Sequence, residues 1–260
     1  MPLARPPLIS RPGNRVTASA EIVADPGPGG STRLPVLRSQ VPLVLRRTPE
    51  AVYLVSAAAG PLGGDQLAVR ITVRAGATLR LRTVAASVAL PGPDGGESLL
   101  AVTASVEPGG SLEYLPEPVV VANGARHATD IRVTLADGAR LLLRDELILG
   151  RHGEQGGSYR GSLRVDYAGR PLLRHLLEVS GTDAATRGPA FLSGHRAVGN
   201  LLRVNLPETP ATQGTTAATS SPDPWVAVMP LTGGPATLTT ALAHDAVTLR
   251  RRLSCAQTAG

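Results

Sequence analysis

The sequence predicts a mainly β protein, a β-helix-like or solenoid-like stack of antiparallel strands with one or two helices near its C-terminal end. A recurring turn pattern and clean apolar–polar alternation on both sides of it are the observations that predict this fold. Residues 73–81, 106–114 and 135–143 each contain an apolar residue, a turn of the form x-x-Gly-small-x and an alternating strand. The copies are about 33 and 29 residues apart, a spacing typical of stacked supersecondary units. A weaker fourth copy begins at Val165.

The N-terminal part is expected to form a tail followed by short strands. Prolines interrupt the later ones, and because proline cannot donate to a strand ladder, we expect these strands at sheet edges. The predicted elements are a flexible tail (1–14), a strand (16–24), a turn (25–30), two short edge strands (34–37 and 41–46) and a further short strand (52–56).

The middle of the chain has the clearest strand pattern. Leu67, Val69, Ile71 and Val73 alternate with polar or small residues, so they share one face of a strand. The same reasoning predicts strands at 79–83, 99–106, 112–115, 131–135, 140–149, 159–167 and 172–179.

Beyond residue 180 the pattern changes. Residues 182–206 are expected to contain a short helix, and residues 207–224, rich in Pro, Thr, Ser and Gly, to form a flexible loop. A short strand is predicted at 225–229 and an amphipathic helix at 236–253. We expect the 260 residues to form a single domain.

All 26 basic residues are arginine, and the chain contains no lysine. Schiff-base chemistry and a phosphate-loop lysine are therefore excluded. The net charge of +6 invites a nucleic-acid function, but arginines such as Arg70 and Arg80 are spread over alternating strand positions and stacking aromatics are scarce. A nucleic-acid-binding β domain is the least favoured alternative.

Cys255 is the single cysteine, so no disulfide framework or cysteine-rich metal site is expected. Residues 1–15 have no apolar core of a signal peptide, and no apolar run approaches the ~20 residues that span a bilayer. We therefore expect a cytoplasmic protein with no membrane partner.

No motif for catalysis stands out. The chain has no Gly-x-Ser-x-Gly nucleophile elbow and no His-Glu-x-x-His zinc motif. Paired carboxylates are available in any β fold with 20 acidic residues, so they have no specificity. A β-solenoid enzyme acting on carbohydrate is the first alternative function.

Three polar clusters lie at turns or strand ends: Gly63 to Asp65, Glu113 to Pro118, and Asp145 to Glu154. Each has an ordinary structural interpretation, as a turn cap, a strand terminator and a hairpin end with Arg151 paired to Glu154. In a stacked fold, however, equivalent strand ends lie close together. The clusters would then form an acidic line that suits transient passage of a divalent cation.

The same clusters, in this order, resemble the urease accessory protein UreD (UreH) family. The resemblance rests on GPLGGDQL (60–67), SLEYLPEPVV (111–120) and LADGARLLLRDELILGRHGE (135–154), and it extends over about residues 33–180. It implies a β-helix-like chaperone with two helices, not an enzyme, that binds apo-urease and recruits UreF and, through it, the GTPase UreG.

The resemblance also implies that nickel passes transiently through this protein, with no tightly bound cofactor. It places these residues along the nickel path: Asp65, Glu113, Glu117, Glu146 and Glu154. It places these residues where they shape the path or meet a partner: Thr83, Tyr114, Pro116 and Arg151.

Overall fold

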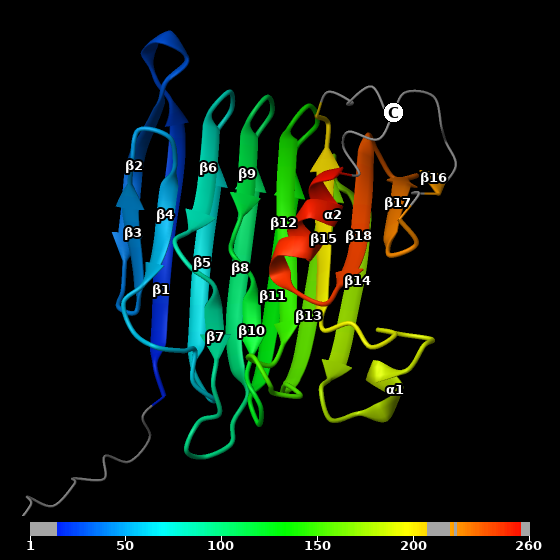
Figure 1. Ribbon diagram of the computed structural model, residues 1–260. Helices are drawn as coiled ribbons and strands as arrows, with labels where there is room; N and C mark the ends of the chain where they lie inside the picture. Colours follow the sequence, from blue (N-terminus) through cyan, green and yellow to red (C-terminus); the bar gives the residue numbers. More distant parts are fainter. Residues whose placement is uncertain (1–14, 207–218, 221–222, 256–260) are drawn as a thin grey trace, which may run out of the picture.

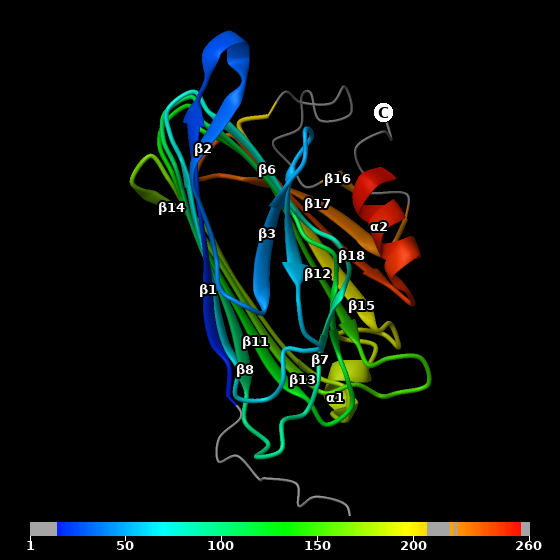
Figure 2. The same cartoon turned by 90° about the vertical axis from the view of Figure 1, so that its left-hand side faces the viewer.

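The computed structural model describes residues 15–206, 219–220 and 223–255. Two β-sheets face each other across a buried core, and a C-terminal helix lies on the outer face of one of them (Figures 1 and 2). The chain crosses repeatedly from one sheet to the other, so each sheet is assembled from strands far apart in the sequence.

The first sheet has seven strands in the order β14-β13-β11-β8-β5-β1-β2. Its five central strands run parallel, and an antiparallel hairpin closes each end. The strands are β1 (Thr17–Pro26), β2 (Thr32–Ser39), β5 (Gln66–Val73), β8 (Ser98–Val106), β11 (Arg126–Leu135), β13 (Ser158–Tyr167) and β14 (Arg170–Ser180); a 3-10 turn, η1 (Pro28–Gly30), joins β1 to β2.

The second sheet has eleven strands, with the main order β16-β17-β18-β15-β12-β9-β6-β4-β3 and with β7 and β10 paired beside β12. Strands β4, β6, β9 and β12 are parallel, whereas the outer strands are antiparallel. The strands are β3 (Leu43–Arg47), β4 (Val52–Ser56), β6 (Thr78–Thr83), β7 (Ser87–Ala89), β9 (Ser111–Leu115), β10 (Val119–Val121), β12 (Arg140–Leu149), β15 (Ala197–Val204), β16 (Thr219–Ser220), β17 (Val226–Leu231) and β18 (Ala236–Ala243).

The predicted β-helix-like stack is confirmed, but its strands are of mixed direction rather than antiparallel. Each turn of the stack leaves one sheet, crosses the other and returns, so successive strands in a sheet point the same way. Antiparallel neighbours need a hairpin, and hairpins occur at the ends of the stack. The predicted short strands with prolines do lie at edges, as β2 and β3.

The repeated turn forms the corner at which the chain passes from the first sheet to the second. Gly76, Gly109 and Gly138 have φ angles of 71°, 69° and 70°, in the left-handed region that glycine adopts without steric cost. Gly169, in the weaker fourth copy, also has a positive φ of 76°. That copy instead connects β13 and β14 as an antiparallel hairpin within one sheet.

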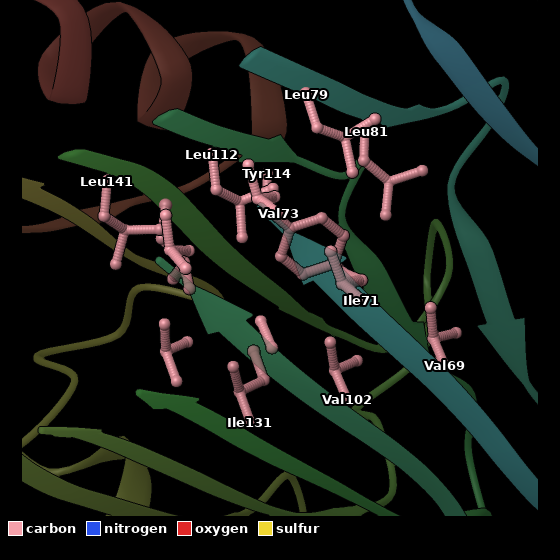
Figure 3. Close-up of a cluster of buried hydrophobic side chains, with 14 of the residues drawn as sticks. Val69, Ile71, Val73, Leu79, Leu81, Val102, Leu112, Tyr114, Ile131 and Leu141 are labelled. Carbon is pink, nitrogen blue, oxygen red and sulfur yellow. The ribbon is translucent and has the colours of Figure 1, made fainter. Parts of the chain in front are cut away.

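The core between the sheets is aliphatic except for Tyr114, as Figure 3 shows. Parallel register places side chains of the same parity in rows, because β5, β8 and β11 align Val69 with Val102 and Val102 with Ile131. Leu81, Tyr114 and Leu143 form the facing row from the second sheet. A second, smaller cluster of buried residues includes Leu147, Tyr159 and Val198.

The C-terminal region differs most from expectation. The short helix is present as α1 (Ala184–Arg187), and the strand at 225–229 is confirmed as β17, but β15 was not predicted. The helix predicted at 236–253 is wrong in its first half, which is strand β18; only α2 (Ala246–Cys255) is helical. Residues 1–14, 207–218 and 221–222 of the predicted tail and loop lie outside the described residues.

Helix α2 begins where Asp245 accepts hydrogen bonds from the backbone and hydroxyl of Thr248, both at 2.8 Å. These bonds satisfy a free amide at the helix start. Its buried Leu249 and Leu253 pack on β15 at Gly199, where a Cβ atom would lie 2.8 Å from Leu253 Cδ1. The glycine thus allows the helix to lie close against the outer face of the second sheet (Figure 2).

Candidate functional site

The second sheet is interrupted in its middle. Leu81, Tyr114 and Leu143 form one paired row, and Ser87, Val119 and Leu147 form the next. Between these rows lie residues 82–86 of the first chain segment, 115–118 of the second and 144–146 of the third. Arg82 still pairs with Leu115, and residues 144–146 stay paired with β15, so the pairing is lost among the remaining residues of the three segments. We call this region, residues 82–86, 115–118 and 144–146, the strand break.

The strand break follows from unequal segment lengths. The three segments that connect the same two rows differ in length: 144–146 has three residues, 115–118 has four and 82–86 has five. Each segment further from β12 therefore contains one extra residue. Extra residues in a ladder are left unpaired and bend the strand, as in a β-bulge. Pro116 and Pro118 reinforce the interruption, because neither can donate a backbone hydrogen bond.

Side chains replace part of the lost pairing. The hydroxyl of Thr83 accepts a hydrogen bond of 2.8 Å from the backbone N–H of Glu117. The guanidinium of Arg144 donates one of 2.9 Å to the carbonyl oxygen of Pro116. These bonds hold the sheet together across the strand break while leaving polar side chains beside an opening.

A pocket of about 610 Å³ lies between the sheets and reaches the strand break. Its lining includes the exposed Val41 (71% exposed) and Val84 (61% exposed) as well as the buried His127. The pocket therefore connects the surface with the protein interior.

The inner wall of the pocket is polar. Asp145 is on β12 between Leu143 and Leu147, which belong to the two separate core clusters, so it shares their inward face. No described residue donates a hydrogen bond to its carboxylate. Burial, and secondarily the charge of Glu146, raises the pKa of Asp145 to about 6. This side chain is thus an acid in an otherwise apolar row.

His127, on β11 of the opposite sheet, also lines the pocket. Its Nδ1 lies 2.9 Å from Ser98 Oγ, and its Nε2 lies 3.3 Å from Thr129 Oγ1. Burial lowers the pKa of His127 to about 4, so the imidazole is neutral near pH 7. Burial also raises the pKa of Tyr114, which keeps that phenol protonated.

A compact ion cluster lies on the helix side of the strand break. Arg250 of α2 binds both oxygens of Glu117, at 3.1 and 3.0 Å, and its Nη2 also donates to Glu146 at 2.8 Å. Arg144 Nε lies 3.1 Å from the same Glu146 oxygen. We call these four residues, Glu117, Arg144, Glu146 and Arg250, the four-charge cluster; its formal charges sum to zero.

Six of the nine residues proposed from sequence line this pocket: Asp65, Thr83, Tyr114, Pro116, Glu117 and Glu146. Asp65 also has a local structural role, because its carboxylate accepts hydrogen bonds of 2.9 Å from the backbones of Val16 and Leu62. The turn-cap interpretation of that segment is therefore correct. The pocket thus brings together members of all three polar clusters, together with Thr83.

The structure does not bring the other three to the pocket. Glu113 points away from it and pairs with Arg80 and Arg82 on the outer face of β9. Glu154 pairs with Arg151 at the exposed hairpin end, and that ion pair lowers the pKa of Glu154 to about 2. The outward direction of Glu113 follows from strand alternation, because its neighbour Tyr114 points inward.

Three residues of the pocket and the four-charge cluster were missed: His127, Arg144 and Arg250. Asp145 was named in the third polar cluster but was not placed among the path residues. Asp145 could have been selected by parity, since an acid there replaces an apolar residue in the inward row of Leu141, Leu143 and Leu147. Arg250 had no such signal, because its contacts join positions more than 100 residues apart.

The polar groups around the pocket are carboxylate oxygens and one neutral imidazole. Both kinds of group are ligands for divalent metals. Within the described ranges, no three His, Cys, Asp or Glu side chains are grouped closely enough to hold a metal ion. Among the same residues, no helix is long and apolar enough to cross a membrane.

Comparison with known proteins gives a consistent family. The family model described as UreD urease accessory protein matches residues 16–259. The chain is 45% identical to the urease accessory protein UreD of Frankia alni, over 92% of this chain and 91% of the relative. It is 44% identical to UreD 3 of Streptomyces griseus (92% and 94%) and 43% identical to UreD of Streptomyces coelicolor (92% and 94%). The chain therefore belongs to the UreD urease accessory protein family.

Proposed function

We propose that this protein is a non-enzymatic scaffold of urease maturation. In this proposal it binds apo-urease and recruits UreF and, through it, the GTPase UreG, so that nickel reaches the urease active site. Membership of the UreD urease accessory family supports the role in urease maturation. The individual partners are part of the proposal, and they are the ones that the sequence resemblance implies.

The observation that carries the nickel part of the proposal is the pocket at the strand break. Its lining combines the exposed Val41 and Val84 with the buried His127 and Glu146 and with the half-buried Asp145. A cation on this route would meet oxygen ligands and a neutral imidazole without leaving the protein. Nickel is a cargo here, since scattered ligands suit transfer better than storage.

Each lining residue has a definite part in the proposed passage. Asp145 is the main ligand, because its carboxylate faces the pocket and is free of hydrogen bonds from described residues. Glu117 and Glu146 are ligands on the helix side of the strand break, and Asp65 fixes one wall through its backbone contacts. The following residues shape the route: Thr83, Tyr114 and Pro116.

Glu113, Glu154 and Arg151 have no part in this passage, because their side chains lie away from the pocket. In this proposal the protein works in the cytoplasm, the location expected from the sequence.

The direct test is co-expression of the full chain with apo-urease, UreF and UreG from the same source. The complex should co-purify, and urease activity should depend on the presence of this chain. A chain that binds neither apo-urease nor UreF, or whose removal leaves urease activity unchanged, would overturn the proposal.

A further inference from the structure

Strand β14 is one edge of the seven-stranded sheet, and it differs from the other edges of the molecule. A free edge exposes unpaired backbone groups, and proteins commonly protect it with a proline or keep the strand short. Strand β2 has Pro35 near its centre, and β3, β7 and β16 contain five, three and two residues. Strand β14 has eleven residues, and its only proline, Pro171, is the second of them. Among the described strands, β14 is therefore the long edge that no proline interrupts in its middle.

The hydrogen bonds of β14 show which of its backbone groups face the free edge. The N–H of Ser180 donates to the hydroxyl of Thr186 at 3.2 Å and not to β13, so it points to that edge. Residues that face the ladder and residues that face the edge alternate in an antiparallel pair, so Arg174, Leu176 and Glu178 share the direction of Ser180. No described strand pairs with them there. Each of these three residues thus offers an N–H and a C=O at the edge.

The side chains of the same three residues form a charge pattern on the outer face of β14. Leu176 is 62% exposed and lies between Arg174 and Glu178. The side chain of Glu178 has no partner among the described residues, and Arg174, paired with Asp166, remains half-exposed. An antiparallel strand would match this face with an acid opposite Arg174, an apolar residue opposite Leu176 and a base opposite Glu178. Read from its N-terminal end, that strand has the pattern base-x-apolar-x-acid.

The second sheet extends further than the first on the side of β14. Its strands β17 and β16 follow β18, and in Figure 1 they lie to the right of β14. Met229 and Leu231 of β17 are only half-buried where they pack on the core, as are Leu173 and Leu177 on the inward face of β14. A single added strand beside β14 would lie over this part of the second sheet. Two whole copies joined at β14 would instead bring their β16 and β17 strands into the same space, so the pattern favours a segment of another protein.

We propose that β14 is a strand-addition site for an extended segment of a partner protein. The segment has a base-x-apolar-x-acid pattern on its outer face and apolar residues on its inner face, and it becomes the eighth strand of the seven-stranded sheet. Main-chain hydrogen bonds supply the affinity in this mode of recognition, and side-chain contacts supply the specificity. Arg174 and Glu178 set the direction and register of the added strand. The proposal does not rest on the nickel passage, because β14 does not line that pocket.

The test is fluorescence anisotropy of a labelled peptide mixed with the purified full-length chain. The probe is a peptide copy of residues 171–179, PLLRHLLEV, because it contains the required pattern as R-x-L-x-E. The control peptide exchanges its arginine and glutamate, which keeps the composition but places like charges opposite Arg174 and Glu178. In the protein, Leu176→Pro removes an N–H that faces the edge and takes no part in pairing with β13. Leu176→Ala keeps that N–H, and circular dichroism melts verify that both variants are folded.

We expect the wild-type chain to bind the probe about tenfold more tightly than the control peptide, because two cross-strand pairs change from attraction to repulsion. Leu176→Pro should weaken binding of the probe by about tenfold or more, since a main-chain hydrogen bond is lost at the centre of the added strand. Leu176→Ala should weaken it less. Hydrogen exchange at the Leu176 and Glu178 amides should slow when the probe is bound.

Equal binding of the two peptides overturns the inference, as does undiminished binding of the probe by folded Leu176→Pro. If Leu176→Pro does not fold, the comparison of the two peptides and the exchange rates at Leu176 and Glu178 still decide the question. Analytical ultracentrifugation of the chain alone tests the other occupant. A dimer that Leu176→Pro abolishes would show that β14 joins two copies of this chain, and it would overturn the assignment to a partner segment.

Discussion

The two sheets of this protein are built from the same repeat but are used differently. In the seven-stranded sheet, β1, β5, β8, β11 and β13 pair in parallel without an interruption in register. In the eleven-stranded sheet, the corresponding segments lose register at the strand break and recover it at β7 and β10. One sheet is a continuous wall, and the other contains an opening lined with charge.

The difference suggests a division of roles: the continuous sheet stabilises the fold, and the interrupted sheet carries the candidate site. The continuous sheet supplies unbroken rows of buried aliphatic residues, which is the main favourable term in folding. The interrupted sheet gives up backbone pairing and buries ionisable groups, both of which cost free energy. Proteins retain such local costs chiefly at functional sites. The predictions below test this division, from the largest expected effect to the smallest.

The continuous sheet should be the most sensitive to loss of packing. Ile71 is 2% exposed at the centre of β5, so Ile71→Ala should lower the free energy of unfolding by about 2 to 5 kcal/mol. Urea unfolding monitored by circular dichroism measures this loss. Leu176→Ala on the exposed face of β14 is the control and should change stability by less than about 0.5 kcal/mol. Equal effects at both positions would remove the distinction.

The buried histidine that lines the pocket from the seven-stranded sheet should make stability depend on acid. The folded-state pKa of His127 is lowered by burial from 6.5 to about 4, so its contribution is present above pH 6.5 and is lost as the pH falls toward 4. The loss should be about 3 kcal/mol. It is measured as the difference between wild type and His127→Gln in urea unfolding at pH 7 and pH 4.

The exposed His152 provides the control for that comparison. His152→Gln should follow the wild type at both pH values. A His127→Gln variant whose stability difference from wild type does not change with pH would show that the imidazole is not held neutral.

The strand break should depend on the hydroxyl that bridges it. Thr83→Val keeps the shape of the side chain but leaves the Glu117 N–H without its 2.8 Å acceptor, at a cost of about 1 to 2 kcal/mol. Hydrogen exchange at the Glu117 amide should become faster. Thr103→Val, on the exposed face of β8, should leave that amide unchanged. Unaltered exchange in Thr83→Val would mean that something else holds the segment.

The corner turns should respond least, and they should respond alike. Gly109 and Gly138 have φ angles of 69° and 70°, so alanine at either position should cost about 1 kcal/mol through backbone strain. Thermal unfolding of the two variants checks this. Costs that differ strongly between the two positions would contradict their structural equivalence.

The sequence predicted the continuous parts of the fold well. Alternation located β4 and β12 at their observed bounds, and the glycine of the repeat marked the corner turns. These features are local, since two or three residues set a turn and side-chain parity sets a strand face. Strand direction was not local, because it depends on whether the chain crosses to the other sheet before it returns.

The candidate site was only partly predictable, for the same reason. Thr83 and Glu117 could be selected because they end repeat strands, and they do meet. The pairing of Arg250 with Glu117 and Glu146 depends on where α2 packs. The helix takes that position because it packs on β15 at Gly199, beside β18. The helical spacing of apolar residues in 236–253 led to a prediction of helix where β18 is found.

The central claim is that nickel passes through the opening in the interrupted sheet, and Asp145 is its most direct test. Asp145→Asn should preserve the fold, because burial already disfavours the ionised carboxylate. The control is Asp166→Asn, in an exposed pair with Arg174 outside the pocket. The measurement is the nickel content of urease matured with each variant. The account predicts an intact complex with nickel-poor urease for Asp145→Asn and normal nickel for Asp166→Asn; full nickel loading with Asp145→Asn would contradict it.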